Sequence, residues 1–259
     1  MKLGMPSMVE LSSIEESAAL CAELGLSFLE LNTNFPNQQI HLLDPQQLRE
    51  IAEKYGIFYT IHLNDEMPVA DFNPAVAGGY LKAMTDAIIF AEKIGAPVLN
   101  MHLSEGARYT MPDRKIWFYG AYEKEYLEGM THFRDICDAA VGRHNIHVCI
   151  ENSGGFLPFH LNALEILMQC NSFGLTLDIG HNHCSGGADG AWILKNRAKL
   201  LHMHIHDVLN GHDHHPLGTG QVDIPHWLTI AQQQHCTAVL EVKTEAGLRQ
   251  SVDWIHENI

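Results

Sequence analysis

The sequence has no run of about eighteen apolar residues, so it contains no transmembrane helix of ordinary length. Its start has no apolar segment followed by small residues, so we expect no secretory signal. The six cysteines are scattered and form no Cys-x-x-Cys pair, which predicts reduced thiols in a cytoplasmic protein rather than a disulfide framework. Basic residues are scarce as well: 16 lysines and arginines against 31 aspartates and glutamates give a net charge of −15, which argues against general nucleic-acid binding.

Apolar residues and histidines are what the sequence has in quantity. Of its 259 residues, 46% are hydrophobic, enough to bury one large core. No proline- or serine-rich linker or low-complexity tract divides the chain, so we expect a single soluble domain spanning residues 1–259. The 18 histidines are a large number for a chain of this length, and they direct attention to metal or acid–base chemistry.

Short apolar runs rich in β-branched residues alternate with longer amphipathic segments. The runs predict strands at Lys2–Met5, Ser27–Asn32, Phe58–Leu63, Val98–Leu103, His147–Asn152, Gly174–Ile179, Leu200–Asp207 and Ala238–Val242. The segments between them predict helices near 13–24, 45–55, 74–94, 121–143, 160–170, 188–198, 226–234 and 245–257. This alternation predicts an α/β fold, a single (β/α)8 TIM barrel; a doubly wound sheet is the rival, but no Gly-x-Gly-x-x-Gly turn follows the first strand.

Polar residues recur at the carboxyl ends of the predicted strands. Because successive side chains alternate across a strand, the apolar neighbours of these residues face the helices and the polar residues face the barrel axis. The inward set comprises His62, His102, Glu151, Asp178, His204 and Glu241, with His202 one layer deeper and His206 one layer higher. In TIM barrels this end of the strands carries the active site.

Converging carboxylates at one mouth require compensating charge. Structural ion pairs would need inward lysine or arginine, and the clear candidate is Lys243 at the rim. A divalent cation removes the repulsion, and mixed histidine and carboxylate ligation suits zinc, manganese, cobalt or iron. The loops add His181, His212 and His214 as further metal ligands, whereas His206 and Lys243 are candidates for substrate contact. His202 is interpreted as a packing residue.

Several motifs resemble those of the xylose isomerase-like TIM-barrel superfamily, which holds sugar isomerases and epimerases, dehydratases and the endonuclease IV repair nucleases. They are Ile150-Glu151-Asn152, Leu177-Asp178-Ile179-Gly180-His181, His204-Ile205-His206-Asp207, Pro216-Leu217-Gly218-Thr219-Gly220 and Leu240-Glu241-Val242. The resemblance covers the whole chain in strand order. It implies one divalent metal, zinc or manganese, held by Glu151, Asp178, His204 and Glu241, with the two glutamates as catalytic acid and base.

These residues predict an isomerase or epimerase of a small carbohydrate, a sugar or sugar phosphate, that works by proton transfer through a metal-stabilised enediolate. A binding module without catalysis explains the paired glutamates less well. No membrane is implied as a partner. Substrate identity, stereochemistry and oligomeric state stay open, and a homo-oligomer is compatible with the sequence.

The resemblance to endonuclease IV carries an alternative, a multinuclear zinc phosphodiesterase. Ligands for two further zinc ions in that enzyme match His62, His102 and His181, and its Asp-x-His pair falls on His212-Asp213-His214, with His212 in place of the aspartate. Two departures weigh against DNA repair: Gly218-Thr219-Gly220 stands where Gly-Glu-Gly is usual, and Leu103-Ser104 replaces Pro-Gly. They do not weigh against a multinuclear site, so we expect more than one ion per chain, two or three, and the phosphodiesterase stays the alternative to the isomerase.

Overall fold

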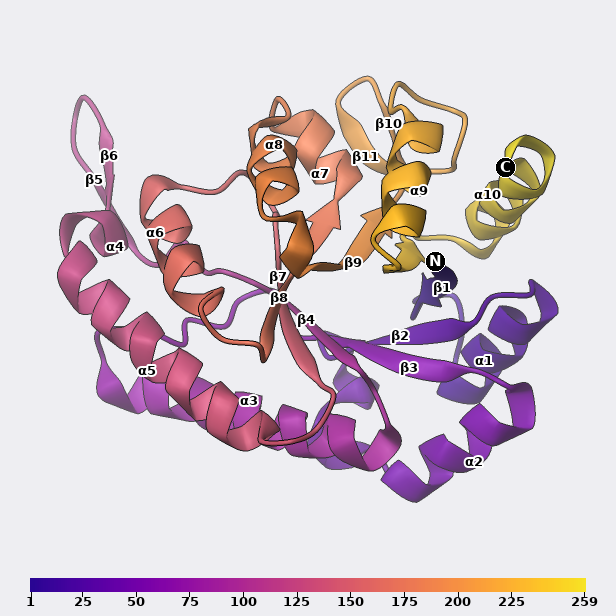
Figure 1. The fold of residues 1–259 in the computed structure, drawn as a ribbon, viewed down its shortest axis with the longest axis horizontal. Coiled ribbons are helices and arrows are strands. Elements are labelled where there is room, and N and C mark those ends of the chain that lie inside the picture. Colours follow the sequence, from indigo (N-terminus) through magenta and orange to yellow (C-terminus); the bar gives the residue numbers. More distant parts are fainter.

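The first and last strands of the barrel pair with each other in parallel, with Lys2 beside Thr237, and this pairing closes the sheet. The computed structural model describes all 259 residues. Around the barrel the strand order is β1-β12-β9-β8-β7-β4-β3-β2, and every neighbouring pair in it is parallel. The strands are β1 (Lys2–Pro6), β2 (Phe28–Asn32), β3 (Phe58–His62), β4 (Val98–His102), β7 (His147–Glu151), β8 (Phe173–Asp178), β9 (Leu200–Ile205) and β12 (Thr237–Leu240). The predicted (β/α)8 barrel is confirmed (Figure 1).

The helices surround the barrel and begin and end where local signals place them. They are α1 (Ile14–Glu23), α2 (Pro45–Tyr55), α3 (Pro74–Ile94), α5 (Glu123–Val141), α6 (Pro158–Leu167), α8 (Ala188–Lys195), α9 (Ile224–Gln233) and α10 (Glu245–Asn258). The Asp44 and Asn73 side chains cap α2 and α3 ahead of a proline at the first helical position. No helix combines the length and the apolar character that a bilayer span requires.

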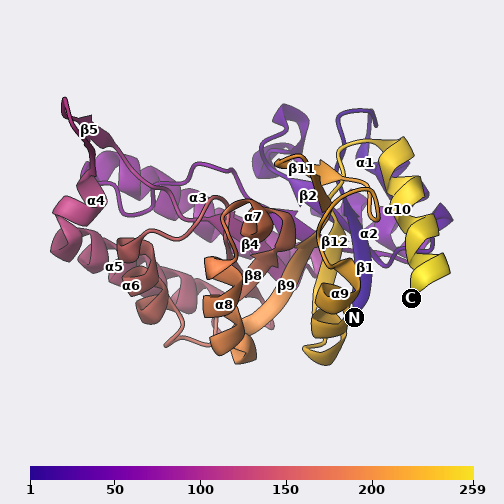
Figure 2. The same ribbon diagram turned by 90° about the horizontal axis from the view of Figure 1, so that it is seen from above.

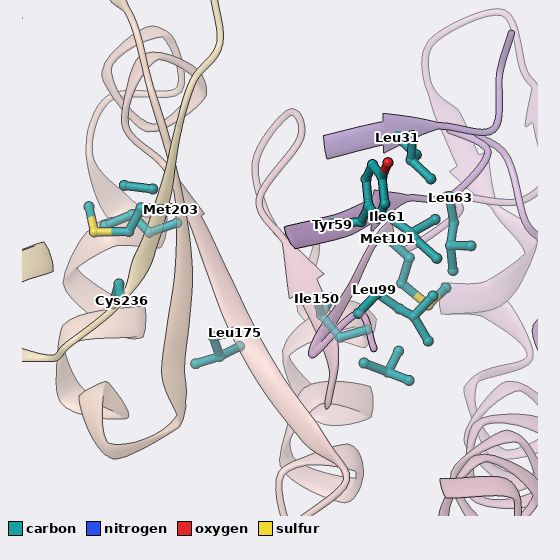
Figure 3. Packing of buried hydrophobic residues seen from close by; sticks show 14 of the residues in the cluster. Leu31, Tyr59, Ile61, Leu63, Leu99, Met101, Ile150, Leu175, Met203 and Cys236 are labelled. Carbon is teal, nitrogen blue, oxygen red and sulfur yellow. The ribbon is translucent and has the colours of Figure 1, made fainter. Parts of the chain in front are cut away.

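The apolar core lies between the barrel and the helices. Leu99, Ile150, Leu175 and Met203, on the outward faces of their strands, are completely buried there, as the close view in Figure 3 shows. Burying each such side chain contributes about 1.5–3 kcal/mol. This outward packing fixes the parity of each strand and so turns the alternate, polar residues toward the barrel axis.

Several short elements extend from the barrel and were not expected from the sequence. After β4 come the hairpin strands β5 (Arg108–Thr110) and β6 (Lys115–Trp117), which project at the left of Figure 1, and then α4 (Phe118–Ala121). After β8 comes α7 (Ile179–Cys184), and after β9 the hairpin of β10 (Asp207–Leu209) and β11 (His212–His215). Helix α7 contacts this second hairpin beyond the ends of β8 and β9 (Figures 1 and 2).

Candidate functional site

The His204 imidazole is surrounded by three carboxylates at the mouth of the barrel. Its Nδ1 lies 3.4 Å from Glu151 Oε1, 3.8 Å from Asp178 Oδ2 and 3.2 Å from Glu241 Oε2. All four side chains are buried. The structure therefore brings together the residues that the sequence predicts as ligands of one metal ion.

Three atoms in this group have no hydrogen-bond partner: His204 Nδ1, His204 Nε2 and Glu241 Oε2. Leaving a buried polar atom unpaired costs about 1–3 kcal/mol. A cation between the carboxylates and the imidazole would satisfy His204 Nδ1 and Glu241 Oε2. One nitrogen with several carboxylate oxygens is a donor set that fits zinc or manganese.

The charges of this group depend strongly on one another. Burial raises the pKa of the Glu151 and Glu241 carboxyls, but the nearby His204 imidazole outweighs it and holds both pKa values well below their usual range. Burial lowers the pKa of His204, yet the carboxylates of Glu151 and Glu241 raise it well above its usual value. In the metal-free chain a proton on His204 thus takes the place that a cation would fill.

Two asparagines hold the carboxylates in place. Asn152 forms a pair of hydrogen bonds with the Asp178 backbone: its Nδ2 donates to the carbonyl oxygen at 2.9 Å, and its Oδ1 accepts from the amide at 2.9 Å. Asn100 Nδ2 donates to Glu151 Oε2. Sequence reasoning assigned no role to either residue, although Asn152 follows Glu151 directly and Asn100 shares a face of β4 with His102.

His206 positions Asp178, and its ring nitrogens are both engaged. The His214 amide donates to His206 Nδ1 at 2.8 Å, so the ring proton lies on Nε2, which donates to the Asp178 carboxylate at 2.9 and 3.0 Å. A Cβ at Gly180 would lie 2.0 Å from His206 Cε1, so only glycine permits this approach. His206 is fully buried, and the structure does not place it for the predicted substrate contact.

His62 and His102 approach Glu151 from the neighbouring strands. His62 Nδ1 donates to the Leu63 carbonyl at 2.7 Å, which directs Nε2 toward Glu151 Oε2, 3.5 Å away. His102 Nε2 lies 3.1 Å from the same oxygen. A ring whose other nitrogen donates to a carbonyl is the usual arrangement of a metal-ligating histidine. Burial lowers the pKa of His62, but Glu151 more than compensates and raises it to about 9.

A third group lies above Asp178 in the loops. His181 Nδ1 faces the Asn152 carbonyl at 3.2 Å and His214 Nδ1 the Glu241 carbonyl at 3.1 Å, so both imidazoles direct Nε2 outward. Asp213 lies between them, with Oδ2 3.6 Å from His181 Nε2 and Oδ1 3.9 Å from His214 Nε2.

The predicted ligand His212 lies apart from these contacts. It is exposed at the first residue of β11, and the carboxylate that faces His181 and His214 belongs to its neighbour Asp213. His214 has a φ of 58°, in the left-handed region that non-glycine residues seldom adopt. This backbone conformation was not predictable from the local sequence. The acidic residue in the His212-Asp213-His214 run was the one signal that could have pointed to Asp213 as a candidate ligand.

Lys243 Nζ lies 2.7 Å from Glu241 Oε1, so the residue predicted to contact substrate is paired with a candidate ligand. Burial lowers the pKa of Lys243, but Glu241 raises it above its usual value.

The Gly218-Thr219-Gly220 loop closes on a carboxylate of the chain itself, because the Gly220 amide donates to Asp207 Oδ2 at 2.7 Å. The Gly220 amide is therefore not free to bind an anion.

Beside Glu151 and His102 lies a cavity of about 160 Å³, large enough for a small molecule. Its lining contains four carboxylates and neither lysine nor arginine: Asp65, Glu66, His102, Leu103, Glu105, Glu151, Ser153, Gly154, Gly155, Phe156 and His160.

The sequence matches the xylose isomerase-like TIM barrel over residues 18–258, nearly the whole chain. The chain belongs to this family. A relative of unassigned function from Methanocaldococcus jannaschii is 21% identical over 201 residues, which are 76% of this chain and 75% of that protein.

Solved structures of the same fold cover almost the entire chain. A D-tagatose 3-epimerase-like protein has a TM-score of 0.78 at 22% identity, covering 99% of this chain and 96% of its own. The 3-keto-D-glucoside 4-epimerase of E. coli has a TM-score of 0.78 at 14% identity, with 99% of both chains covered. The IolI protein with a zinc atom has a TM-score of 0.75 at 14% identity, covering 99% and 97%. At these identities the likeness establishes the fold.

Proposed function

We propose that the protein is a divalent-metal-dependent isomerase or epimerase of a small carbohydrate, a sugar or sugar phosphate, and that Glu151 and Glu241 exchange the proton. The observation that carries the proposal is the position of these two glutamates, both buried and both within 3.4 Å of the unpaired His204 Nδ1. The epimerases among the structural neighbours support it.

We assign the four converging residues Glu151, Asp178, His204 and Glu241 to the primary ion, zinc or manganese. Such an ion polarises a substrate carbonyl as a Lewis acid and stabilises negative charge that develops beside it. The two glutamates then move the proton: one removes it from the carbon next to the carbonyl, and the other returns it. Both carboxyls have pKa values well below the usual range, so either is ionised at neutral pH and able to begin as the base.

The other residues hold this arrangement. Asp178 accepts from the His181 amide at 2.7 Å as well as from His206, which leaves it a ligand rather than a base. Lys243 holds Glu241 from the rim. The neighbouring cavity is where we place the remainder of the carbohydrate, whose hydroxyls would donate to the carboxylates that line it.

Deuterium exchange tests the proposal on many carbohydrates at once, so the preferred substrate need not be chosen beforehand. The metal-loaded protein is incubated in D2O with a panel of ketoses and ketose phosphates, and NMR follows deuterium entering the carbon next to the carbonyl. We expect incorporation with at least one member, and its loss in Glu151→Gln, in Glu241→Gln and with a chelator. Absence of incorporation across the panel would contradict the proposal.

The second candidate, a multinuclear zinc phosphodiesterase, is favoured by one observation: His181, Asp213 and His214 converge, as do His62 and His102 on Glu151. Clustered zinc ions suit phosphoester hydrolysis. For this site we take Asp213, rather than His212, as the carboxylate ligand. Hydrolysis of bis(p-nitrophenyl) phosphate by the zinc-loaded protein, without deuterium exchange into any ketose, would favour this candidate over the first.

A further inference from the structure

Glu30 lies inside the barrel on β2, on the opposite side of His204 from the candidate metal ligands. It is 1% exposed, and its carboxylate reaches two histidines of β9. Oε1 lies 3.1 Å from His204 Nε2, and Oε2 lies 3.0 Å from His202 Nε2. Thr60 Oγ1 on β3 also donates to Oε2, at 2.9 Å. A fully buried carboxylate with this set of neighbours is either a structural hub or part of the site.

The hydrogen-bonding capacity of a carboxylate decides where the protons are. An ionised carboxylate only accepts, so a ring nitrogen that bonds to it must carry a proton. His202 therefore donates from Nε2, and its Nδ1 is left for Thr237 Oγ1, which lies within hydrogen-bond distance on the far side. When a cation occupies the space beside Nδ1, the remaining ring proton of His204 lies on Nε2, which is 3.1 Å from Glu30 Oε1.

The consequence for His204 is a free lone pair on Nδ1. A neutral imidazole carries one ring proton, so a proton on Nε2 leaves Nδ1 able to ligate. Nδ1 is the atom surrounded by the carboxylates of Glu151, Asp178 and Glu241. In the opposite tautomer the Nδ1 proton would point at the space the ion must occupy.

We propose that Glu30 is a positioning residue of the metal centre, which holds His204 in the tautomer and ring orientation that present Nδ1 to the ion. The proposal rests on the proposed metal-dependent function. Carboxylates that bond to the far nitrogen of a ligating histidine fix its tautomer and raise its basicity, and losing them costs about 10- to 100-fold in metal affinity.

The angle between Glu30 and His204 supports a role that is completed by the ion. Although the two atoms are 3.1 Å apart, His204 Nε2 makes no properly aligned hydrogen bond. Hydrogen bonds at sites of this kind are often misaligned without a ligand and tighten when it binds.

The test is Glu30→Gln, which keeps the shape of the side chain and removes the charge. One end of the amide is a donor and must face a donor on one of its neighbours, so we expect the Zn²⁺ affinity to fall about 10- to 100-fold, measured by competition with a chromogenic chelator. The matched control is Thr237→Val, which removes a hydrogen bond from the same buried chain at His202, away from His204. We expect the control to bind Zn²⁺ as tightly as the wild type.

Two further measurements separate positioning from a merely structural role. In Zn²⁺-saturated protein with 15N-labelled histidine, and with His204→Gln for assignment, we expect the Nε2–H tautomer at His204 in the wild type and loss of the protected Nε2–H signal in Glu30→Gln. The rise in Tm on adding Zn²⁺ should shrink in the variant, whereas a purely structural role lowers Tm equally with and without the ion. If Glu30→Gln does not fold, Glu30→Asp keeps the charge but shortens its reach, and we expect it to bind Zn²⁺ more weakly than the wild type.

The outcomes are distinguishable. A wild-type chain that binds no divalent metal would overturn the proposed function and this proposal with it. A wild type that binds Zn²⁺ tightly, beside a folded Glu30 variant of equal affinity with the tautomer unchanged, would overturn the role of Glu30 alone.

Discussion

His204 and Glu241 face each other across 3.2 Å at the mouth of the barrel, and the two facing atoms, Nδ1 and Oε2, make no hydrogen bond. Leaving two buried polar atoms without a hydrogen bond costs free energy, and such an arrangement persists when the surrounding structure imposes it. Here β9 and β12 are paired in register, with Val239 beside His204, so the barrel sets the separation. The opposition of imidazole and carboxylate is thus built into the sheet rather than into a flexible loop.

Removing either glutamate charge should stop the reaction. We expect Glu151→Gln and Glu241→Gln each to lower kcat about 10²- to 10⁴-fold, the usual contribution of a positioned acid or base, while the barrel still folds. Deuterium exchange and circular dichroism provide the measurements. Glu53→Gln makes the same chemical change at an exposed position of α2 and should have no effect. Near wild-type turnover in either site variant would remove that glutamate from the acid–base role.

The metal-free protein should lose stability as the pH rises from about 6.5 to 9. Burial lowers the pKa of His62 and of His181, but the carboxylates around them raise both to about 9. A pKa raised above its unfolded value stabilises the folded chain below about pH 6.5, and this contribution disappears as the pH passes the folded value. Tm measured in chelator should therefore fall across this range. With bound metal the decline should be smaller, because a cation replaces the protons; a flat metal-free profile would contradict the expectation.

The protein should bind more than one ion per chain. Beyond the primary four ligands, His181, Asp213 and His214 form one further group, and His62 and His102 join Glu151 in another. Elemental analysis of protein purified without chelator should give two or three ions, and anomalous diffraction should locate them. The double variant His181→Ala, His214→Ala should lose one ion.

His212, the exposed neighbour of Asp213, provides a control for the number of bound ions. His212→Ala should leave the number of ions unchanged, whereas Asp213→Asn should weaken the same site that the double variant empties. A single ion in the wild type would leave these histidines to bind substrate hydroxyls or phosphate. Loss of an ion in His212→Ala would restore that residue as a ligand.

Duplex DNA containing an abasic site should not bind tightly. With a net charge of −15, the chain has little of the basic surface from which such binding derives its affinity and its salt dependence. A mobility-shift titration at low salt, together with an incision assay, measures this. Salt-sensitive binding together with cleavage at the site would promote the phosphodiesterase over the isomerase.

Replacing Gly180 and Gly79 by alanine should change the stability of the chain in opposite directions. At Gly180 a Cβ would collide with His206, so Gly180→Ala should lower Tm and weaken metal binding through Asp178. At Gly79, in the exposed interior of α3, nothing lies within 4 Å, and Gly79→Ala should stabilise the chain by about 0.5–1 kcal/mol. Chemical denaturation with and without metal distinguishes the two; an unchanged metal affinity in Gly180→Ala would separate His206 from the site.

Strand positions and the inward direction of the candidate ligands were predictable because outward apolar packing sets parity over whole strands. Glu151 between two outward-facing neighbours is the example, since Ile150 is fully buried and Glu151 joins the site. Glu30 has the same pattern between Leu29 and Leu31, but its role depends on a contact with β9 that no local pattern encodes.

The loop contributions were less predictable, and for a different reason. The position of Asp213 depends on the left-handed conformation of His214 and on the irregular pairing of β10 with β11. The hairpin of β5 and β6 was missed because Arg108, Tyr109 and Thr110 are all exposed, so no apolar alternation marks the first strand. The conformation of such elements depends on the tertiary contacts they make, and the periodicity of the sequence does not encode those contacts.

The candidate ligands come from β3 at one extreme and from just beyond β12 at the other, and the closed barrel brings these segments to one mouth. If the proposed ion binds there, it would act as a non-covalent cross-link across most of the chain, and its binding free energy would oppose the opening of the barrel. The rate of amide hydrogen exchange between the paired strands β1 and β12 reports local opening of the sheet, so this rate should fall as the metal site is filled. Metal occupancy would then be measurable from the backbone of the barrel itself, without any substrate.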